Sequence, residues 1–220
     1  YLKEIHIPKT LTSIGEGAFT MFWRLEKFVV DPDNPNYSSD QYGVLFDKNK
    51  TMVLAYPTAR VGEYTLPASV TQVGKQAFLQ AKITQLTIPS RITYIGYEAF
   101  RSTAIKSLTF EEPSQITSLN NREFLWCNNL KEVTLPKSLV YLGHGFSGCP
   151  NLETVNVPDG SQLKAILSNA FVACENLTNF NFLGSCKLEN IGSNAFADKQ
   201  KLKAFHFPAS VTNIGDNAFG

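Results

Sequence analysis

The chain has 220 residues with a net charge of +1, 18% charged residues and four cysteines. Lysine and arginine are interspersed with aspartate and glutamate rather than clustered, which makes nucleic acids and anionic membranes poor candidates as partners. The sequence contains no signal peptide and no apolar run of about eighteen residues, which excludes a spanning helix within this segment but not export.

One phrase recurs along the chain, first as Ile14-Gly15-x-x-Ala18-Phe19 and last as Ile214-Gly215-x-x-Ala218-Phe219. We call its last residue the anchor phenylalanine. After an interval of 59 residues between the first two, successive anchors lie 22 to 25 residues apart; the set is Phe19, Phe78, Phe100, Phe124, Phe146, Phe171, Phe196 and Phe219. A repeat of this length predicts a solenoid, because a unit so short buries a core only by stacking on its neighbours.

A second phrase precedes each anchor, as in Leu25-x-x-Phe28-x-Val30, and its apolar-x-apolar ending predicts a short strand with one buried face. Stacked units then form a parallel sheet with strands about 4.8 Å apart. The segment Val70-Thr71-Gln72-Val73-Gly74 predicts a second, shorter strand on the return path. The Ala-Phe pair is expected on a single helical turn, with each anchor ring in the core.

The long interval is predicted to be an insertion at about residues 31–62. Two apolar runs, 44–46 and 52–56, flank the polar turn Asp47-Lys48-Asn49-Lys50, which predicts a β-hairpin. The insertion is rich in tyrosine, with Tyr37, Tyr42 and Tyr56. Two interpretations remain open: these rings bind a partner, or they cover the flank of the neighbouring coils.

The glycine of the repeated phrase is replaced by Asn120 and by Leu167 in two coils. Asparagine fits a turn with positive φ, whereas leucine does not. The sequence therefore leaves open whether this glycine column serves a left-handed turn or close packing between coils.

The cysteines and histidines give no indication of a reactive site. Cys127, Cys149 and Cys174 share one column and are expected to be free, mostly buried thiols, with Cys186 in a loop. No Cys/His spacing suits zinc, and no catalytic motif accompanies the three histidines, of which His6 and His206 fall at opposite ends of the sheet. We therefore predict no catalytic residue, no metal and no cofactor.

Two exposed surfaces are candidate binding sites. The first lies on the return path, where aromatic side chains share neighbouring columns: Tyr94, Tyr97, Tyr141 and His144. Exposed aromatic side chains supply contact area at interfaces and platforms for sugar rings. The alternative is the outward column of the main sheet, Thr65, Thr87, Thr109, Thr134, Asn156 and Asn181. That column suits a glycan or an extended peptide, but it also fits a plain exposed β-ladder.

The complete unit is clearest near the end of the chain, as Leu202-x-x-Phe205-x-Phe207-Pro208 followed by Val211-Thr212-x-Ile214-Gly215-x-x-Ala218-Phe219. These phrases resemble the BspA-type, or Treponema pallidum-type, leucine-rich repeat of bacterial surface proteins, and the insertion resembles one that recurs in that family. The resemblance implies a leucine-rich-repeat solenoid (an α/β class fold) in a secreted or cell-surface protein that binds host matrix proteins, other cells or glycans.

We therefore expect residues 1–220 to form one domain that acts as a non-enzymatic binding or adhesion module. The alternative is a structural spacer that presents another domain at the cell surface. An enzyme remains possible only if a catalytic domain lies outside these residues. Tyr1 begins inside a strand phrase and Gly220 follows an Ala-Phe pair directly, so we expect a fragment of a longer chain, with further coils or a cap after Gly220.

Overall fold

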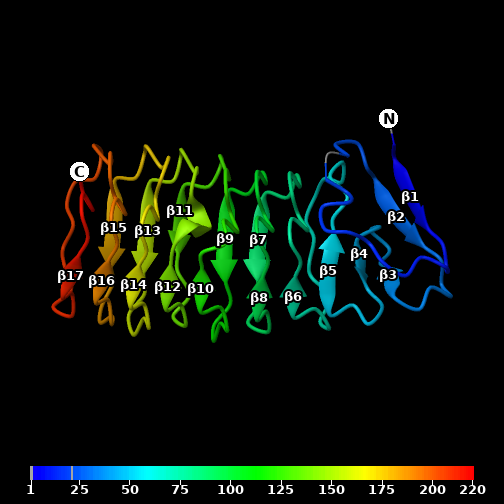
Figure 1. Ribbon diagram of the computed structural model, residues 1–220, viewed down its shortest axis with the longest axis horizontal. Coiled ribbons are helices and arrows are strands. Elements are labelled where there is room, and N and C mark those ends of the chain that lie inside the picture. The colour runs from blue at the N-terminus through cyan, green and yellow to red at the C-terminus, as the bar shows by residue number, and fades with distance from the viewer. Residues whose placement is uncertain (1, 21) are drawn as a thin grey trace.

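The computed structural model describes residues 2–20 and 22–220. The chain winds into an elongated solenoid in which successive coils stand side by side along the long axis, with the two termini at opposite ends (Figure 1). Strands of one face and strands of the return path form two rows, and the apolar core lies between them. The predicted solenoid with two sets of parallel strands is confirmed.

The strands of the first face form what we call the main sheet. They are β1 (Glu4–Ile7), β2 (Lys27–Val30), β7 (Gln85–Ile88), β9 (Ser107–Phe110), β11 (Glu132–Thr134), β13 (Thr154–Val157) and β15 (Asn179–Phe182). The pairs β1–β2, β7–β9, β11–β13 and β13–β15 are parallel. Thr87 stands beside Thr109, and Asn156 stands between Thr134 and Asn181, so these members of the predicted outward column are in register.

The return strands are two residues long and form the return sheet: β6 (Gln72–Val73), β8 (Tyr94–Ile95), β10 (Ser118–Leu119), β12 (Tyr141–Leu142), β14 (Ala165–Ile166), β16 (Asn190–Ile191) and β17 (Asn213–Ile214). They pair in two groups, one of which runs β10-β12-β14-β16-β17. The second short strand predicted for the return path is therefore present.

The insertion contains β3 (Tyr37–Ser39), β4 (Leu45–Asp47) and β5 (Met52–Ala55). Strands β4 and β5 form the predicted antiparallel hairpin, and the Asp47 carboxylate accepts hydrogen bonds from the backbone N–H groups of Thr51 and Met52 across its turn. Strand β5 then pairs in parallel with β6. The insertion thus extends the return sheet into the five-stranded group β3-β4-β5-β6-β8.

The Ala-Phe segments differ from the expected helical turn. Among the described residues the one helical segment is a 3₁₀ helix, η1 (His144–Phe146). Elsewhere the chain reverses through tight turns, such as the bond from the Ala99 N–H to the Gly96 carbonyl at 3.1 Å. The anchor backbone instead bonds to the next coil, for example from the Phe100 N–H to the Glu123 carbonyl at 2.8 Å. This pattern forms a third ladder along the solenoid.

The glycine column serves close packing. A Cβ atom added to Gly96 would lie 2.6 Å from the backbone nitrogen of Lys75 in the preceding coil, and one added to Gly74 would lie 2.8 Å from the Val53 carbonyl oxygen. Neither glycine has a positive φ, and nor does Asn120, so of the two interpretations that the sequence left open, the left-handed turn is excluded at these positions. Positive φ occurs two residues further on, at Gln76 and Glu98 among others.

The anchor rings form a stacked spine inside the solenoid. Phe124 lies 5.3 Å from Phe100 and 5.3 Å from Phe146, centroid to centroid, with interplanar angles of 5° and 9°. Within the insertion, Tyr56 stacks on Phe78 at 4.9 Å and so continues the spine. The rings therefore hold successive coils at the spacing that the backbone ladders require.

The cysteine column is buried beside this spine, as predicted. The Cys127, Cys149 and Cys174 thiols are free, and the Cys149 S–H group donates to the Phe124 carbonyl at 3.2 Å. Cys127 and Cys174 bond in the same way to the anchor carbonyl of an earlier coil. Burial raises the pKa of the Cys174 thiol to about 11, so this thiol is protonated at neutral pH.

Glu123 occupies the position that alanine holds in most coils, and its side chain is 1% exposed. Its carboxylate accepts hydrogen bonds from the backbone N–H groups of Asn120 and Asn121 at 3.2 and 3.0 Å. Gly145, the equivalent residue of the next coil, packs closely on Leu119, because a Cβ atom there would lie 2.8 Å from the Leu119 Cβ atom, whereas its distance of 3.4 Å to a Glu123 carboxylate oxygen would be an ordinary contact. Burial raises the pKa of Glu123 to about 7 despite these bonds.

Replacing Phe124 with alanine removes a fully buried ring between two stacked neighbours. We expect Phe124→Ala to lower the free energy of unfolding by about 3–5 kcal/mol in urea titrations. Phe219→Ala is the matched control, because Phe219 has the same place in the last coil but is 39% exposed. An equal loss for both variants would contradict the buried spine.

The raised pKa of Glu123 predicts how stability depends on pH. In the unfolded chain this carboxyl titrates near its ordinary value of 4.5, so the folded state binds the proton more tightly. This contribution, at most about 3 kcal/mol, is complete below pH 4.5 and is lost as the pH rises to 7. The test measures the free energy of unfolding in urea at several pH values. Over that window it should fall less steeply with rising pH for Glu123→Gln than for wild type.

The exposed carboxylate of Glu153 provides the control for this experiment. The Glu153→Gln variant should keep the wild-type dependence of the free energy of unfolding on pH. If Glu123→Gln also kept it, Glu123 would titrate alike in the folded and unfolded chains.

Candidate functional site

The main sheet carries a groove at its N-terminal half. Thr65 and Thr87 line it together with Gln85 and Arg91. The Arg91 guanidinium is fixed to the preceding coil, because it donates to the carbonyls of Leu66, Pro67 and Val70 at 2.9 to 3.1 Å. The groove therefore has a polar floor and a rigid wall, although Thr65 itself lies outside the regular strands.

In the C-terminal half of the same column, side chains of neighbouring strands form hydrogen bonds with one another. The Asn181 amide donates to the Asn156 side-chain oxygen at 2.9 Å, and the Asn156 amide donates to a Glu132 carboxylate oxygen at 2.7 Å. Asn156 is 9% exposed. These amides satisfy one another, so the exposed threonines, Thr65, Thr87, Thr109 and Thr134, form the more accessible part of the face.

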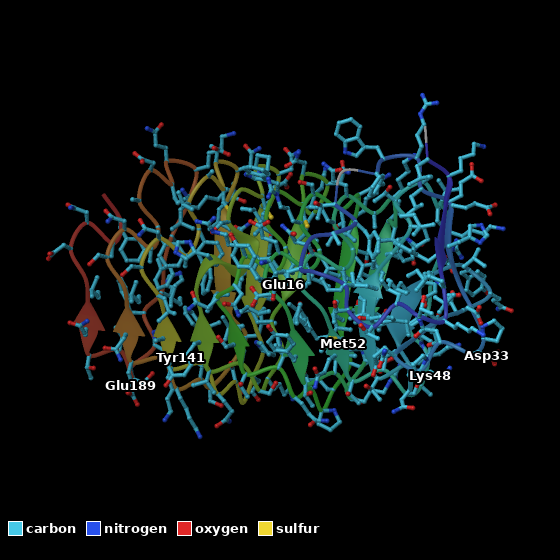
Figure 2. All side chains as sticks on the ribbon, turned by 45° about the vertical axis from the view of Figure 1, so that its right-hand side comes forward. Glu16, Asp33, Lys48, Met52, Tyr141 and Glu189 are labelled. Atoms are coloured by element: carbon cyan, nitrogen blue, oxygen red, sulfur yellow. The ribbon has the colours of Figure 1, made fainter. Side chains whose placement is uncertain are left out.

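The return sheet presents the predicted tyrosines to solvent. Tyr94 on β8 and Tyr141 on β12 are 47% and 48% exposed. Tyr141 lies beside Ser118 of β10 in register, and the β10 coil comes between those of the two tyrosines. Tyr141 is labelled in Figure 2, on the side of the return sheet. The two side chains share a face but lie in different groups of paired strands.

Tyr97 and His144 make contacts of their own. Tyr97 is 39% exposed, and its ring centroid lies 5.9 Å from the ammonium nitrogen of Lys75. His144 Nδ1 lies 3.2 Å from the Ser147 hydroxyl, and burial together with the charge of Arg122 lowers the pKa of His144. Among the contacts of the described residues none joins two of these four side chains directly. They lie as two pairs, Tyr94 with Tyr97 and Tyr141 with His144, on coils that the β10 coil separates.

The sequence interpretation missed an exposed tryptophan, Trp126, which is 46% exposed and has φ +59°. The guanidinium carbon of Arg101 lies 4.4 Å from its ring centroid. Trp126 and His144 line a common hollow. The available signal was its column, two residues after the anchor, where other coils carry small or polar residues: Gln80, Ser102, Gly148, Ala173 and Asp198.

Two tyrosines of the insertion, Tyr42 and Tyr56, pack on Tyr64, which follows the insertion. Tyr56 is 3% exposed, and its ring lies 5.3 Å from that of Tyr64, whose hydroxyl donates to an Asp40 carboxylate oxygen at 2.7 Å. Tyr42 completes the cluster, 5.8 Å from Tyr64, and the Arg60 guanidinium lies over its ring at 4.4 Å. Of the two interpretations, this packing favours cover for the neighbouring coils, with only Tyr42 largely exposed.

A further cavity separates the first Ala-Phe turn from the insertion. Met52 and Leu54 of β5 line it, and the carboxylate of Glu16 meets the Lys75 ammonium beside it at 2.6 Å. Glu16 and Met52 are marked in Figure 2. This cavity lies where the core divides, because the residues around Phe28 form a cluster separate from the main one.

Residues 2–20 and 22–220 contain neither a cluster of metal ligands nor a candidate membrane span. No three His, Cys, Asp or Glu side chains in these ranges gather closely enough to hold a metal ion. No helix there has the length and apolar character needed to cross a bilayer.

Comparison with known proteins agrees with the fold. The model of the BspA type leucine rich repeat region matches residues 1–42, 55–162 and 109–220 in six copies. A leucine-rich repeat protein from Eubacterium ventriosum is 26% identical, with a TM-score of 0.72 over 99% of this chain and 58% of its own. A leucine rich cell surface protein from Faecalibacterium prausnitzii is 28% identical, with a TM-score of 0.73 over 84% of this chain and 48% of its own.

The pneumococcal vaccine antigen PcpA shares the fold, with a TM-score of 0.67 at 23% identity over 99% of this chain and 52% of its own. No curated protein matches the sequence. The chain spans about half the length of the solved proteins to which it is similar. Because the repeat model covers nearly every residue, the chain belongs to the BspA-type leucine-rich repeat family.

Proposed function

We propose that this chain is a binding and adhesion module of a bacterial cell-surface or secreted protein. It recognises extracellular-matrix proteins, cell-surface proteins or glycans through the main-sheet face and the exposed residues of the return path. Family membership supports protein interaction as its general role. The similarity to a leucine rich cell surface protein and to a vaccine antigen supports the surface location.

One structural observation carries the proposal: exposed aromatic side chains stand on a backbone that hydrogen bonds hold rigid from coil to coil. Tyr94 and Tyr141 are about half exposed, yet the backbone beneath them belongs to paired strands. Aromatic residues fixed in this way lose little conformational entropy on binding, which is why they are enriched at interfaces. Without a bound partner, the exposed aromatic side chains provide no such advantage.

A spacer is the second candidate function, and the main core cluster, which extends from Val44 to Ala218, favours it. The stacked rings from Tyr56 to Phe146 and the parallel sheets make a stiff rod. Such a rod presents another domain away from the cell surface whether or not its own faces bind anything. The two functions separate experimentally, because only the first requires specific surface residues.

The test is a glycan and matrix-protein array probed with the purified segment and with the double variant Tyr94→Ala, Tyr141→Ala. If the return face binds the partner, the double variant should bind at least about tenfold more weakly, as expected when two aromatic contacts are lost. Thr65→Lys with Thr87→Lys tests the main-sheet groove in the same assay, because the added charges obstruct its floor.

Thr10→Lys is the matched control, since Thr10 is exposed in the turn after β1 and belongs to neither surface. Thermal unfolding should show that every variant keeps its fold. Absence of any partner on the array would count against a binding module and in favour of the spacer.

A further inference from the structure

Trp126 adopts a conformation that bulky residues rarely adopt. Its φ of +59° lies in the left-handed region, which is unfavourable for a residue with a Cβ atom. Burial offsets this cost only in part, since the side chain is 46% exposed. Positive φ recurs in this column, at Gln80, Ser102, Ala173 and Asp198, so the conformation belongs to the turn of the repeat. What distinguishes Trp126 is the large aromatic ring that it exposes there.

The indole is held in place by both neighbouring coils. In the next coil, a Cβ atom on Gly148 would collide with indole atoms Cδ1 and Nε1, so the absence of a side chain there makes room for the ring. In the preceding coil, Arg101 stacks on the indole at 4.4 Å and pairs with Glu98 at 2.9 Å. Glu98 is 4% exposed and also accepts a hydrogen bond from the Gln76 amide at 3.0 Å.

Polar groups surround the exposed part of the ring. Arg122, His144 and Ser147 line the same hollow as Trp126. The exposed Arg122 guanidinium has no hydrogen bond or ion pair within the described part of the chain, whereas the Glu98 carboxylate is already paired with Arg101. The unbalanced charge of the hollow is therefore that of Arg122. Guanidinium groups bind carboxylates through two parallel hydrogen bonds.

We propose that Trp126 is the platform of a saccharide-binding site that accepts a pyranose ring bearing a carboxylate. The apolar face of the sugar lies against the indole, and the carboxylate lies at Arg122. A sugar hydroxyl bonds to His144 Nε2, which is left free because Nδ1 contacts the buried Ser147 hydroxyl. This inference rests on the proposed binding function and names one ligand class and one site for it.

The size of the hollow favours a saccharide over an extended peptide. Its lining residues come from the Trp126 coil and from coils on both sides of it, from Arg101 on one side to Val172 on the other. At about 4.8 Å per coil, this hollow is long enough for one or two sugar rings. An extended peptide would also need a row of unpaired backbone groups, whereas the Trp126 and Gly148 N–H groups already bond to the carbonyls of Ser147 and Val172.

The experiment titrates the ¹⁵N-labelled segment with methyl β-D-glucuronide and follows the two indole N–H signals. The chain contains two tryptophans, and Trp23, which is 60% exposed, acts as an internal control. We expect the Trp126 signal to shift and the Trp23 signal to stay in place. Methyl β-D-glucoside, which lacks the carboxylate, should bind at least about tenfold more weakly because it forms no charged bond with Arg122.

Three variants complete the test. Trp126→Ala should abolish saturable binding of the glucuronide, whereas Trp23→Ala should leave it unchanged. Arg122→Gln should bring glucuronide binding down to the level of the glucoside. Trp126→Phe keeps an aromatic face and should retain part of the affinity, which separates a lost platform from a lost fold.

An unmoved Trp126 signal in the wild-type protein at saturating glucuronide would overturn the inference without any variant. So would a tetraglutamate peptide that shifts Trp126 when the glucuronide does not. If the array finds partners that Trp126→Ala still binds and the glucuronide shifts no signal, this site fails while the proposed binding function stands. If glucuronide binding is confirmed and no matrix protein binds, the function narrows to glycan recognition.

Discussion

The structure depends on backbone contact between successive coils in register. Three hydrogen-bond ladders run along the solenoid, through the main sheet, the return sheet and the anchor turns. The anchor rings lie inside at 5.0 to 5.3 Å from Phe78 to Phe146, a spacing close to that of neighbouring strands. Because every unit packs only on its neighbours, a change in one coil has to be accommodated by the next.

The coil that contains Asn120, Glu123 and Trp126 shows this dependence most clearly. Each of these residues departs from the repeat, and two of them are matched by a glycine in the following coil: Gly143 leaves room for Asn120, and Gly148 leaves room for Trp126. A buried carboxylate and an exposed indole are therefore built into the repeat without loss of register. The regular scaffold holds such exceptions rigidly, and they are the positions where a specific function is most easily placed.

The repeat was sufficient to predict the architecture because its period and its apolar alternation both depend on local spacing. The anchor spine, the two sets of strands and the hairpin before Tyr56 follow from those patterns. The helical turn did not, since sequence alone does not show that the Phe100 N–H bonds to the next coil instead of within its own turn. Nor does it show the role of the glycine column, which depends on the distance between Gly96 and Lys75 in different coils.

The candidate sites were harder to predict for the same reason. Exposure of Tyr94 and Tyr141 follows from strand alternation, and it is present. The mutual hydrogen bonding of Asn156 and Asn181 depends on side-chain geometry across coils. The support of Trp126 by Arg101 and Gly148 likewise joins residues from three coils that no local pattern relates. The conformational preference of asparagine was also a poor guide to the position of the turn. Asn120 suits a left-handed turn, but the positive φ occurs two residues later, at Arg122.

The most direct measurement of contact between coils compares two glycines of the same column. A methyl group on Gly96 would meet the Lys75 backbone, whereas one on Gly15 would meet nothing within 4 Å, and neither residue has a positive φ. Urea unfolding should therefore show that Gly96→Ala lowers the free energy of unfolding by about 1–3 kcal/mol, while Gly15→Ala leaves it unchanged or slightly higher. Equal effects of the two substitutions would contradict coils held in backbone contact.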